Sequence, residues 1–207
     1  MEKYSRIKAL ISLDAIRYNF EQMKKNIKEG TKIIAVIKAD AYGHGAVPIA
    51  RMLEEFDYIW GFAAATAQEA LQLRKAGITR PILILGLVFE EYYKKLAEND
   101  VRMAVCDYET ARKFNKAAEA AGKKGLIHLA ADTGMTRIGF KDSEESLEEI
   151  RRIAALPNVE IEGLFTHFAR ADEYDRTPAM VQLKRYLDFA DLLEKKWNPY
   201  STASLFQ

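Results

Sequence analysis

Six short apolar runs, rich in isoleucine and valine, recur along the chain, and segments with helical periodicity separate them. Each run is nearly continuous in its apolar residues, which is typical of strands buried on both faces of a parallel sheet. Strands that alternate with helices predict an α/β fold, either a doubly wound sheet or a barrel. The expected strands cover residues 32–40, 58–64, 81–87, 101–107, 126–132 and 159–168.

The segments between the strands carry helix start and stop signals. Thr66 is followed three residues later by Glu69, which matches a capping box. Gly30, Gly77 and Gly122 each follow a helical pattern, so we expect them at helix C-termini. The expected helices cover residues 13–30, 66–77, 108–122, 142–156 and 177–197.

The number of strand–helix units bears on how the sheet is arranged. A (β/α)8 barrel takes about 250 residues, whereas this chain has 207 and shows six units, with residues 198–207 beginning a seventh. We therefore expect a TIM-type (β/α)8 barrel that is incomplete here, with residues 1–207 forming the N-terminal domain of a longer protein. A complete open sheet is the alternative.

Composition excludes several classes of function. Lys and Arg number 31 and Asp and Glu number 30, so the near-neutral chain shows no electrostatic signature of nucleic-acid or membrane binding. The single cysteine, Cys106, excludes an internal disulfide, and three histidines without ligand spacing make a metal site unexpected. The charged N-terminus does not resemble a signal peptide, and no run reaches the length of a membrane span. We expect a cytoplasmic protein.

Lys38 is the first candidate for chemistry, within "AVIKADAYGHG" at residues 35–45. It lies at the expected end of a buried strand, where active-site residues of parallel α/β proteins gather. Partial burial favours a neutral amine, which can form a Schiff base with a carbonyl. Gly43 and Gly45 permit unusual backbone conformations beside it, and Tyr42 and His44 offer hydrogen bonds. The alternative is a snorkelling lysine at a strand end.

Two further strands end in polar side chains. "DTGMTRIGF" places Asp132 and Arg137 after the fifth strand, and "FTHF" places His167 at the end of the sixth. Taken singly, each has an ordinary alternative, a surface arginine or a core histidine. Their convergence with Lys38 at one end of a parallel sheet instead favours a functional site, in which Arg137 can supply a cationic fork for a carboxylate or a phenolate oxygen. We interpret His128, inside the fifth strand, as structural.

The motifs "AVIKADAYGHG", "DTGMTRIGF" and "GLFTHFARADE" together resemble those of the alanine racemases, which use pyridoxal 5′-phosphate. The resemblance extends over essentially the whole chain but only over the N-terminal part of a family member. It implies a barrel domain followed, in full-length proteins, by a β-rich domain. It also implies interconversion of L- and D-alanine, which supplies D-alanine for peptidoglycan, and a homodimer. The 207-residue chain alone is expected to have little activity.

The resemblance implies roles for matched positions. Lys38 would hold the cofactor through an imine and act as a base on one face of the amino acid. Tyr42 would help to bind the phosphate, and His167 would pack against the pyridine ring. Arg137 would contact the phenolic oxygen of the cofactor and the substrate carboxylate. Met135 would line the substrate site with its backbone.

One phosphate contact of the family is matched only loosely, and this sequence departs from the family pattern in two places. The family carries an Asn-Ser pair near the tail "YSTAS", where Thr202 or Ser204 is the nearest match. Family members commonly have a modified lysine that supports the arginine, and this chain has Ala130 at that place. The second base, a tyrosine of a partner subunit, and the arginine that faces the pyridine nitrogen have no counterpart in this sequence.

Three other interpretations stay open. The chain could be a single-domain pyridoxal-phosphate homeostasis protein on the same barrel, although such proteins lack "DAYGHG". It could be a racemase for serine or another amino acid. It could also be a catalytically silent fragment whose exposed sheet edges pair with another chain.

Overall fold

The sheet of the protein is parallel throughout, and its strands follow one another in chain order. In the computed structural model, which describes residues 8–197 and 202–203, seven strands form one sheet in the order β1-β2-β3-β4-β5-β6-β7. A doubly wound sheet reverses its strand order at a switch point, and this sheet does not. The strands are β1 (Ile33–Val36), β2 (Ile59–Ala64), β3 (Ile82–Ile84), β4 (Val101–Val105), β5 (Gly125–Ala131), β6 (Val159–Thr166) and β7 (Thr202–Ala203).

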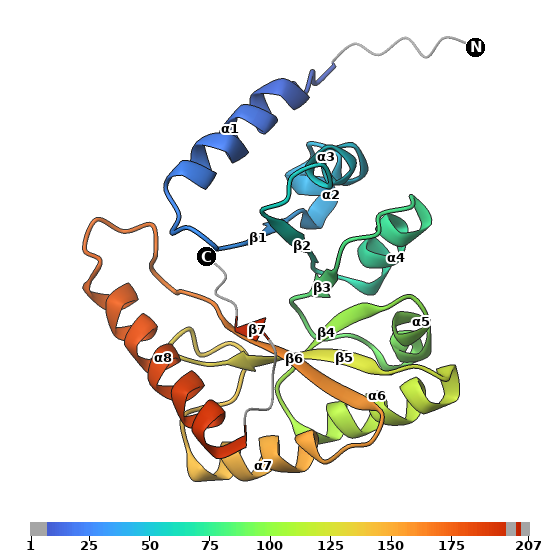
Figure 1. Ribbon diagram of the computed structural model, residues 1–207, viewed down its shortest axis with the longest axis vertical. Helices are drawn as coiled ribbons and strands as arrows, with labels where there is room; N and C mark the ends of the chain where they lie inside the picture. The colour runs from blue at the N-terminus through green and yellow to red at the C-terminus, as the bar shows by residue number, and fades with distance from the viewer. Residues whose placement is uncertain (1–7, 198–201, 204–207) are drawn as a thin grey trace.

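Helices form an outer layer around the curled sheet (Figure 1). This arrangement matches part of a TIM-type barrel, as the alternating sequence pattern predicts. Among the described residues, no helix combines the length and the apolar character needed to cross a bilayer. The helices are α1 (Leu13–Lys25), α2 (Lys38–Tyr42), α3 (Ala46–Leu53), α4 (Ala67–Lys75), α5 (Tyr93–Glu98), α6 (Tyr108–Ala121), α7 (Glu144–Ala154) and α8 (Thr177–Trp197), with a 3₁₀ turn, η1 (Glu90–Tyr92).

The two faces of the sheet carry different cores. The outer face packs against the helices in one continuous apolar cluster with large side chains such as Phe62, Phe114 and Phe189. The inner face holds a smaller cluster dominated by alanine. Because side chains alternate across a strand, the near-continuous apolar runs supply both clusters at once. The inner cluster consists of Ala63, Leu83, Ala104, Ala130 and Phe165.

Several helix boundaries follow the signals in the sequence, and one does not. Thr66 and Glu69 form a capping box at the start of α4, and Gly122 ends α6 in the left-handed conformation. The expected C-cap at Gly30 is wrong, because α1 ends at Lys25 and Asn26 is its C-cap. Helices α3 and α5 were not expected. Pro48 in α3 lies within the first turn, where its missing N–H costs no helical hydrogen bond.

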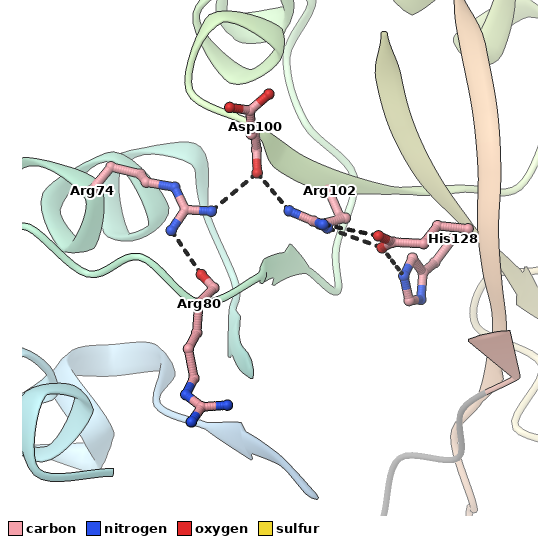
Figure 2. Close-up of polar contacts among 6 residues, drawn as sticks. Arg74, Arg80, Asp100, Arg102 and His128 are labelled. Atoms are coloured by element: carbon pink, nitrogen blue, oxygen red, sulfur yellow. Dashed lines mark hydrogen bonds and ion pairs between the residues drawn. The ribbon is translucent and has the colours of Figure 1, made fainter. Parts of the chain in front are cut away.

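Arginine side chains join the loops that lead into the strands. Arg74 donates to the backbone carbonyl oxygens of Ile78, Arg80, Asn99 and Asp100, so the guanidinium ties the entries of β3 and β4 together (Figure 2). Each of these carbonyl groups would otherwise need a partner in a partly buried loop.

A charged cluster lies on the inner face of the sheet. Arg102 donates two hydrogen bonds to Glu162, at 2.9 and 2.8 Å, and His128 Nε2 lies 3.0 Å from the same carboxylate (Figure 2). Burial favours the protonated form of Glu162, but the hydrogen bonds from His128 and Arg102 outweigh it and lower its pKa to about 2. His128 is fully buried, in agreement with the structural role expected for it.

Candidate functional site

The sequence pattern predicts that Lys38 lies at the end of a strand, and this prediction is wrong. Strand β1 stops at Val36, and Lys38 opens the short turn α2. The four residues that follow, residues 39–42, all have positive φ angles between 51° and 54°. Left-handed backbone costs a residue other than glycine roughly 1–2 kcal/mol. The amine is therefore carried on a strained turn rather than on a regular strand, and surrounding contacts must stabilise that turn.

Hydrogen bonds within the "KADAYGHG" segment close the turn on itself. Gly43 N donates to Ala39 O at 3.0 Å, and Gly45 N donates to Asp40 O at 2.8 Å. The Asp40 carboxylate accepts a hydrogen bond from Ala46 N at 2.7 Å, which caps the start of α3. Gly43 and Gly45 have φ angles of 86° and 93°, so the expectation that they provide unusual backbone conformations is confirmed.

The Lys38 side chain is half-buried and lies near Tyr42. The Nζ atom is 5.9 Å from the centroid of the Tyr42 ring, whose side chain is largely exposed. Within the part of the chain that the structure describes, the amine makes no hydrogen bond or ion pair. His44 instead contacts a backbone carbonyl oxygen, that of Ala41, at 2.9 Å through Nδ1. Among the described residues, neither the Lys38 amine nor the Tyr42 hydroxyl has a hydrogen-bond partner, so both are available to a ligand.

Arg137 lies in a tightly closed loop after β5. The Asp132 carboxylate accepts hydrogen bonds from Gly134 N at 3.1 Å and Thr136 N at 2.8 Å, so Asp132 shapes the loop. Thr136 has a φ angle of 56°, and the loop returns to β5 at Phe140. The Arg137 side chain is exposed and, among residues 8–197, has no hydrogen-bond or ion-pair partner. Its guanidinium can bind an anion.

His167 follows β6 and is half-buried. Burial lowers its pKa, and the positive charges of Arg137 and Lys38 lower it further. The three side chains follow the carboxyl ends of β1, β5 and β6 in one parallel sheet, so they lie on the same rim. The lowered pKa favours the neutral imidazole, which does not add to the positive charge.

Gln182 of α8 connects the loops that carry Arg137 and His167, and the sequence analysis missed it. Its amide nitrogen donates to Thr133 Oγ1 at 3.0 Å and to His167 O at 3.2 Å, while its oxygen accepts from Ala169 N at 2.9 Å. Thr133 also contacts Thr166 at 2.8 Å. A signal was present, since Gln182 is the polar member at the start of the buried stripe of α8 that continues through Tyr186, Phe189 and Leu193.

The structure describes some of the other expected site residues fully, one in part and one not at all. Met135 is half-buried in the loop beside Arg137. Thr202 pairs with Gly163 in β7, but its side chain lies outside the description, and Ser204 lies outside the described residues altogether. Ala130 is buried in the inner cluster next to Phe165 and offers no polar group to Arg137. Cys106 is half-buried, and burial with the neighbouring Asp107 carboxylate raises the pKa of its thiol to about 11.

The geometry defines a parallel α/β barrel segment with a cationic rim. This rim carries the His167 imidazole together with an amine and a guanidinium that have no polar partner among residues 8–197. Such a rim suits an anionic ligand that carries a carbonyl group, because the amine can bond to the carbonyl and the cations attract the anion.

Comparison with known proteins identifies the family. The model for "Alanine racemase, N-terminal domain" matches residues 11–205, so the chain belongs to this family. An alanine racemase of Methanococcus maripaludis is 41% identical over 187 residues, which are 90% of this chain and 50% of that protein. An alanine racemase of Clostridium perfringens strain SM101 is 44% identical over 186 residues, 90% and 48% of the two chains. The chain spans about half the length of these relatives.

Solved structures support the same fold. The alanine racemase of Clostridium difficile 630, in complex with cycloserine, matches with a TM-score of 0.90 and 40% identity over 94% of this chain and 53% of that one. A histidine racemase from Leuconostoc mesenteroides matches with a TM-score of 0.82 and 27% identity over 94% and 51%. The curled sheet is therefore the barrel fold of the alanine racemase N-terminal domain.

Proposed function

We propose that residues 1–207 form the pyridoxal-phosphate-binding domain of an alanine racemase. The observation that carries the proposal is the position of Lys38, Arg137 and His167 after the carboxyl ends of three parallel strands, in a barrel that belongs to this family. Because the chain spans about half of its relatives, the activity, the substrate and the partner subunit are all part of the proposal.

The residues present fit the cofactor. The Lys38 amine is half-buried and unpaired in the described residues, as a covalent attachment point requires. Tyr42, directly beside it, is exposed and can donate to a phosphate oxygen. The neutral ring of His167 can pack against a pyridine ring.

Arg137 has the planar fork of donors that a carboxylate or a phenolic oxygen accepts. Met135 lines the substrate side through its backbone in this proposal, and Thr202 and Ser204 complete the phosphate site. When bound, pyridoxal phosphate supplies an electron sink for the negative charge that develops at the α-carbon of the amino acid.

Lys38 moves a proton on one face of the substrate. In the loaded protein, Lys38 would hold the cofactor, and its Nζ would also be the group that removes or returns the α-proton on that face of the substrate. Inversion also needs a group on the opposite face, and the proposal places it on a partner subunit, so the active protein is a homodimer with shared sites. A cytoplasmic location and the supply of D-alanine for peptidoglycan belong to the same proposal.

Borohydride trapping tests the attachment point. We expect pyridoxal phosphate and borohydride to add mass to the peptide that contains Lys38, and we expect Lys38→Ala to abolish this addition. Lys184→Ala is the matched control, since Lys184 is exposed on α8 and pairs with Asp188. A mass addition on another residue, or none in the wild-type protein, would refute the proposal.

A coupled assay for D-alanine tests the two-subunit part. The isolated chain is expected to turn over slowly or not at all, and robust turnover would contradict the requirement for a second group. The histidine racemase relative favours a second candidate substrate class, so L-histidine and L-serine belong in the same assay.

A further inference from the structure

From the contacts between α4 and the lysine turn, we infer that Glu69 is a positioning residue for Lys38. Its carboxylate fixes the peptide group that directly follows Lys38, and so fixes the direction in which the amine leaves the backbone. The inference deepens the proposed function, because it concerns the same amine.

The carboxylate of Glu69 joins two strand–helix loops. Oε1 accepts a hydrogen bond from Ala39 N at 2.7 Å. Oε2 accepts from Ala65 N at 2.8 Å and from Thr66 N at 3.2 Å. The first of these contacts spans 30 residues of sequence, from the first turn of α4 to the turn after β1.

A helix-capping role accounts for only part of this arrangement. In a capping box, the glutamate side chain returns to the backbone N–H of the N-cap residue. Here Oε2 performs that function at Thr66, and the Thr66 hydroxyl accepts from Glu69 N at 3.3 Å in return. The other oxygen, Oε1, bonds to Ala39, which belongs to a different element. The box alone gives no reason for that second contact.

The contact with Ala39 falls where the lysine turn needs support. Residues 39–42 form the left-handed stretch, and the turn's own hydrogen bonds use the N–H groups of Ala41, Gly43 and Gly45. The N–H of Ala39 is satisfied from outside, by Glu69. Because the Lys38 side chain has no polar partner among the described residues, its backbone sets where the amine points.

Two substitutions separate positioning from capping. Glu69→Gln keeps the size of the side chain but replaces one acceptor oxygen with an NH2 group. The single remaining oxygen cannot accept from Ala39 N and from the Ala65 and Thr66 amides together. Thr66→Ala is the matched control, since it removes the hydroxyl half of the capping box and leaves the Glu69 carboxylate in place.

Hydrogen exchange and amine acylation read the outcome without any cofactor. In Glu69→Gln we expect the Ala39 amide to exchange on the order of tenfold faster or more, as the loss of a hydrogen bond to a charged acceptor predicts. We also expect the pH profile for acylation of Lys38 by acetic anhydride to shift. Thr66→Ala should leave both measurements near those of the wild-type protein. Equal effects of the two substitutions, or no effect of Glu69→Gln, would overturn the inference.

A measurement on the wild-type protein covers the case in which Glu69→Gln does not fold. The Ala39 amide proton resonance should shift with the titration of the Glu69 carboxyl group, together with that of Ala65. An Ala39 resonance that does not follow this titration would overturn the inference. If borohydride trapping fails while these results hold, the proposed function is refuted and the positioning contact stands.

Discussion

The guanidinium of Arg102 and the carboxylate of Glu162 face each other on the inner surface of the sheet, 60 residues apart in sequence and joined by two hydrogen bonds. Both side chains are largely buried, with 12% and 14% of their surfaces exposed. Removing one partner of such a pair leaves the other charge buried and unpaired, which is costly.

This pair predicts a specific loss of stability in acid. Glu162 has a pKa of about 2 in the folded protein, whereas its ordinary value is 4.5. The contribution of its ionised form to the free energy of unfolding is therefore complete above pH 4.5 and is lost as the pH falls toward 2. The contribution is on the order of 3 kcal/mol. We expect the difference in unfolding free energy between the wild-type protein and Glu162→Gln to narrow over that window. A difference independent of pH would show that the carboxylate does not titrate in this way.

Gln182→Leu tests the buried link between the loops of Arg137 and His167. The substitution keeps much of the side-chain volume but removes partners from Thr133, His167 O and Ala169 N. We expect a loss of about 1–3 kcal/mol in urea unfolding, because buried polar groups are left unsatisfied. Gln72→Leu, on the exposed face of α4, is the control and should change stability by less than about 0.5 kcal/mol. Similar losses in both variants would argue against the link.

Gly139→Ala tests how tightly the arginine loop is closed. Gly139 has a φ angle of 126°, and an added Cβ would lie 2.6 Å from Asp132 N, which is backbone and cannot move aside alone. Gly30→Ala is the matched control, because Gly30 has a φ angle of 82° but open space around it. We expect Gly30→Ala to cost about 1 kcal/mol and Gly139→Ala at least about 2 kcal/mol more in thermal or urea unfolding. Equal costs would mean that the loop adapts.

Cys106 should react slowly with thiol reagents in the folded protein. Its pKa is about 11, whereas the ordinary value for a cysteine is 9.0. This difference reduces the thiolate fraction at pH 8 by about 100-fold. Ellman's reagent should therefore label the native protein far more slowly than the urea-unfolded chain. Comparable rates would contradict the expectation, because they would show that the thiol is accessible and ionised in the folded protein.

The fold and the principal candidate residues could be predicted because each leaves a local trace in the sequence. Buried parallel strands appear as apolar runs, and Thr66 with Glu69 marks a helix start. The turn after Lys38 leaves no such trace at Ala39, Asp40 or Ala41, whose left-handed backbone depends on contacts from elsewhere in the chain. The periodic stripe of α8 indicates that Gln182 is buried, but its hydrogen-bond partners, like that of the second Glu69 oxygen, depend on tertiary packing.

The ties made by Arg74, and the ion pair of Arg102 with Glu162, lie toward the amino-terminal ends of the strands, whereas Lys38, Arg137 and His167 follow the carboxyl ends. The contacts that hold the strand entries together and the proposed ligand site therefore lie at opposite ends of the strands. Substitutions at the proposed site can accumulate without removing the contacts that keep the strands assembled.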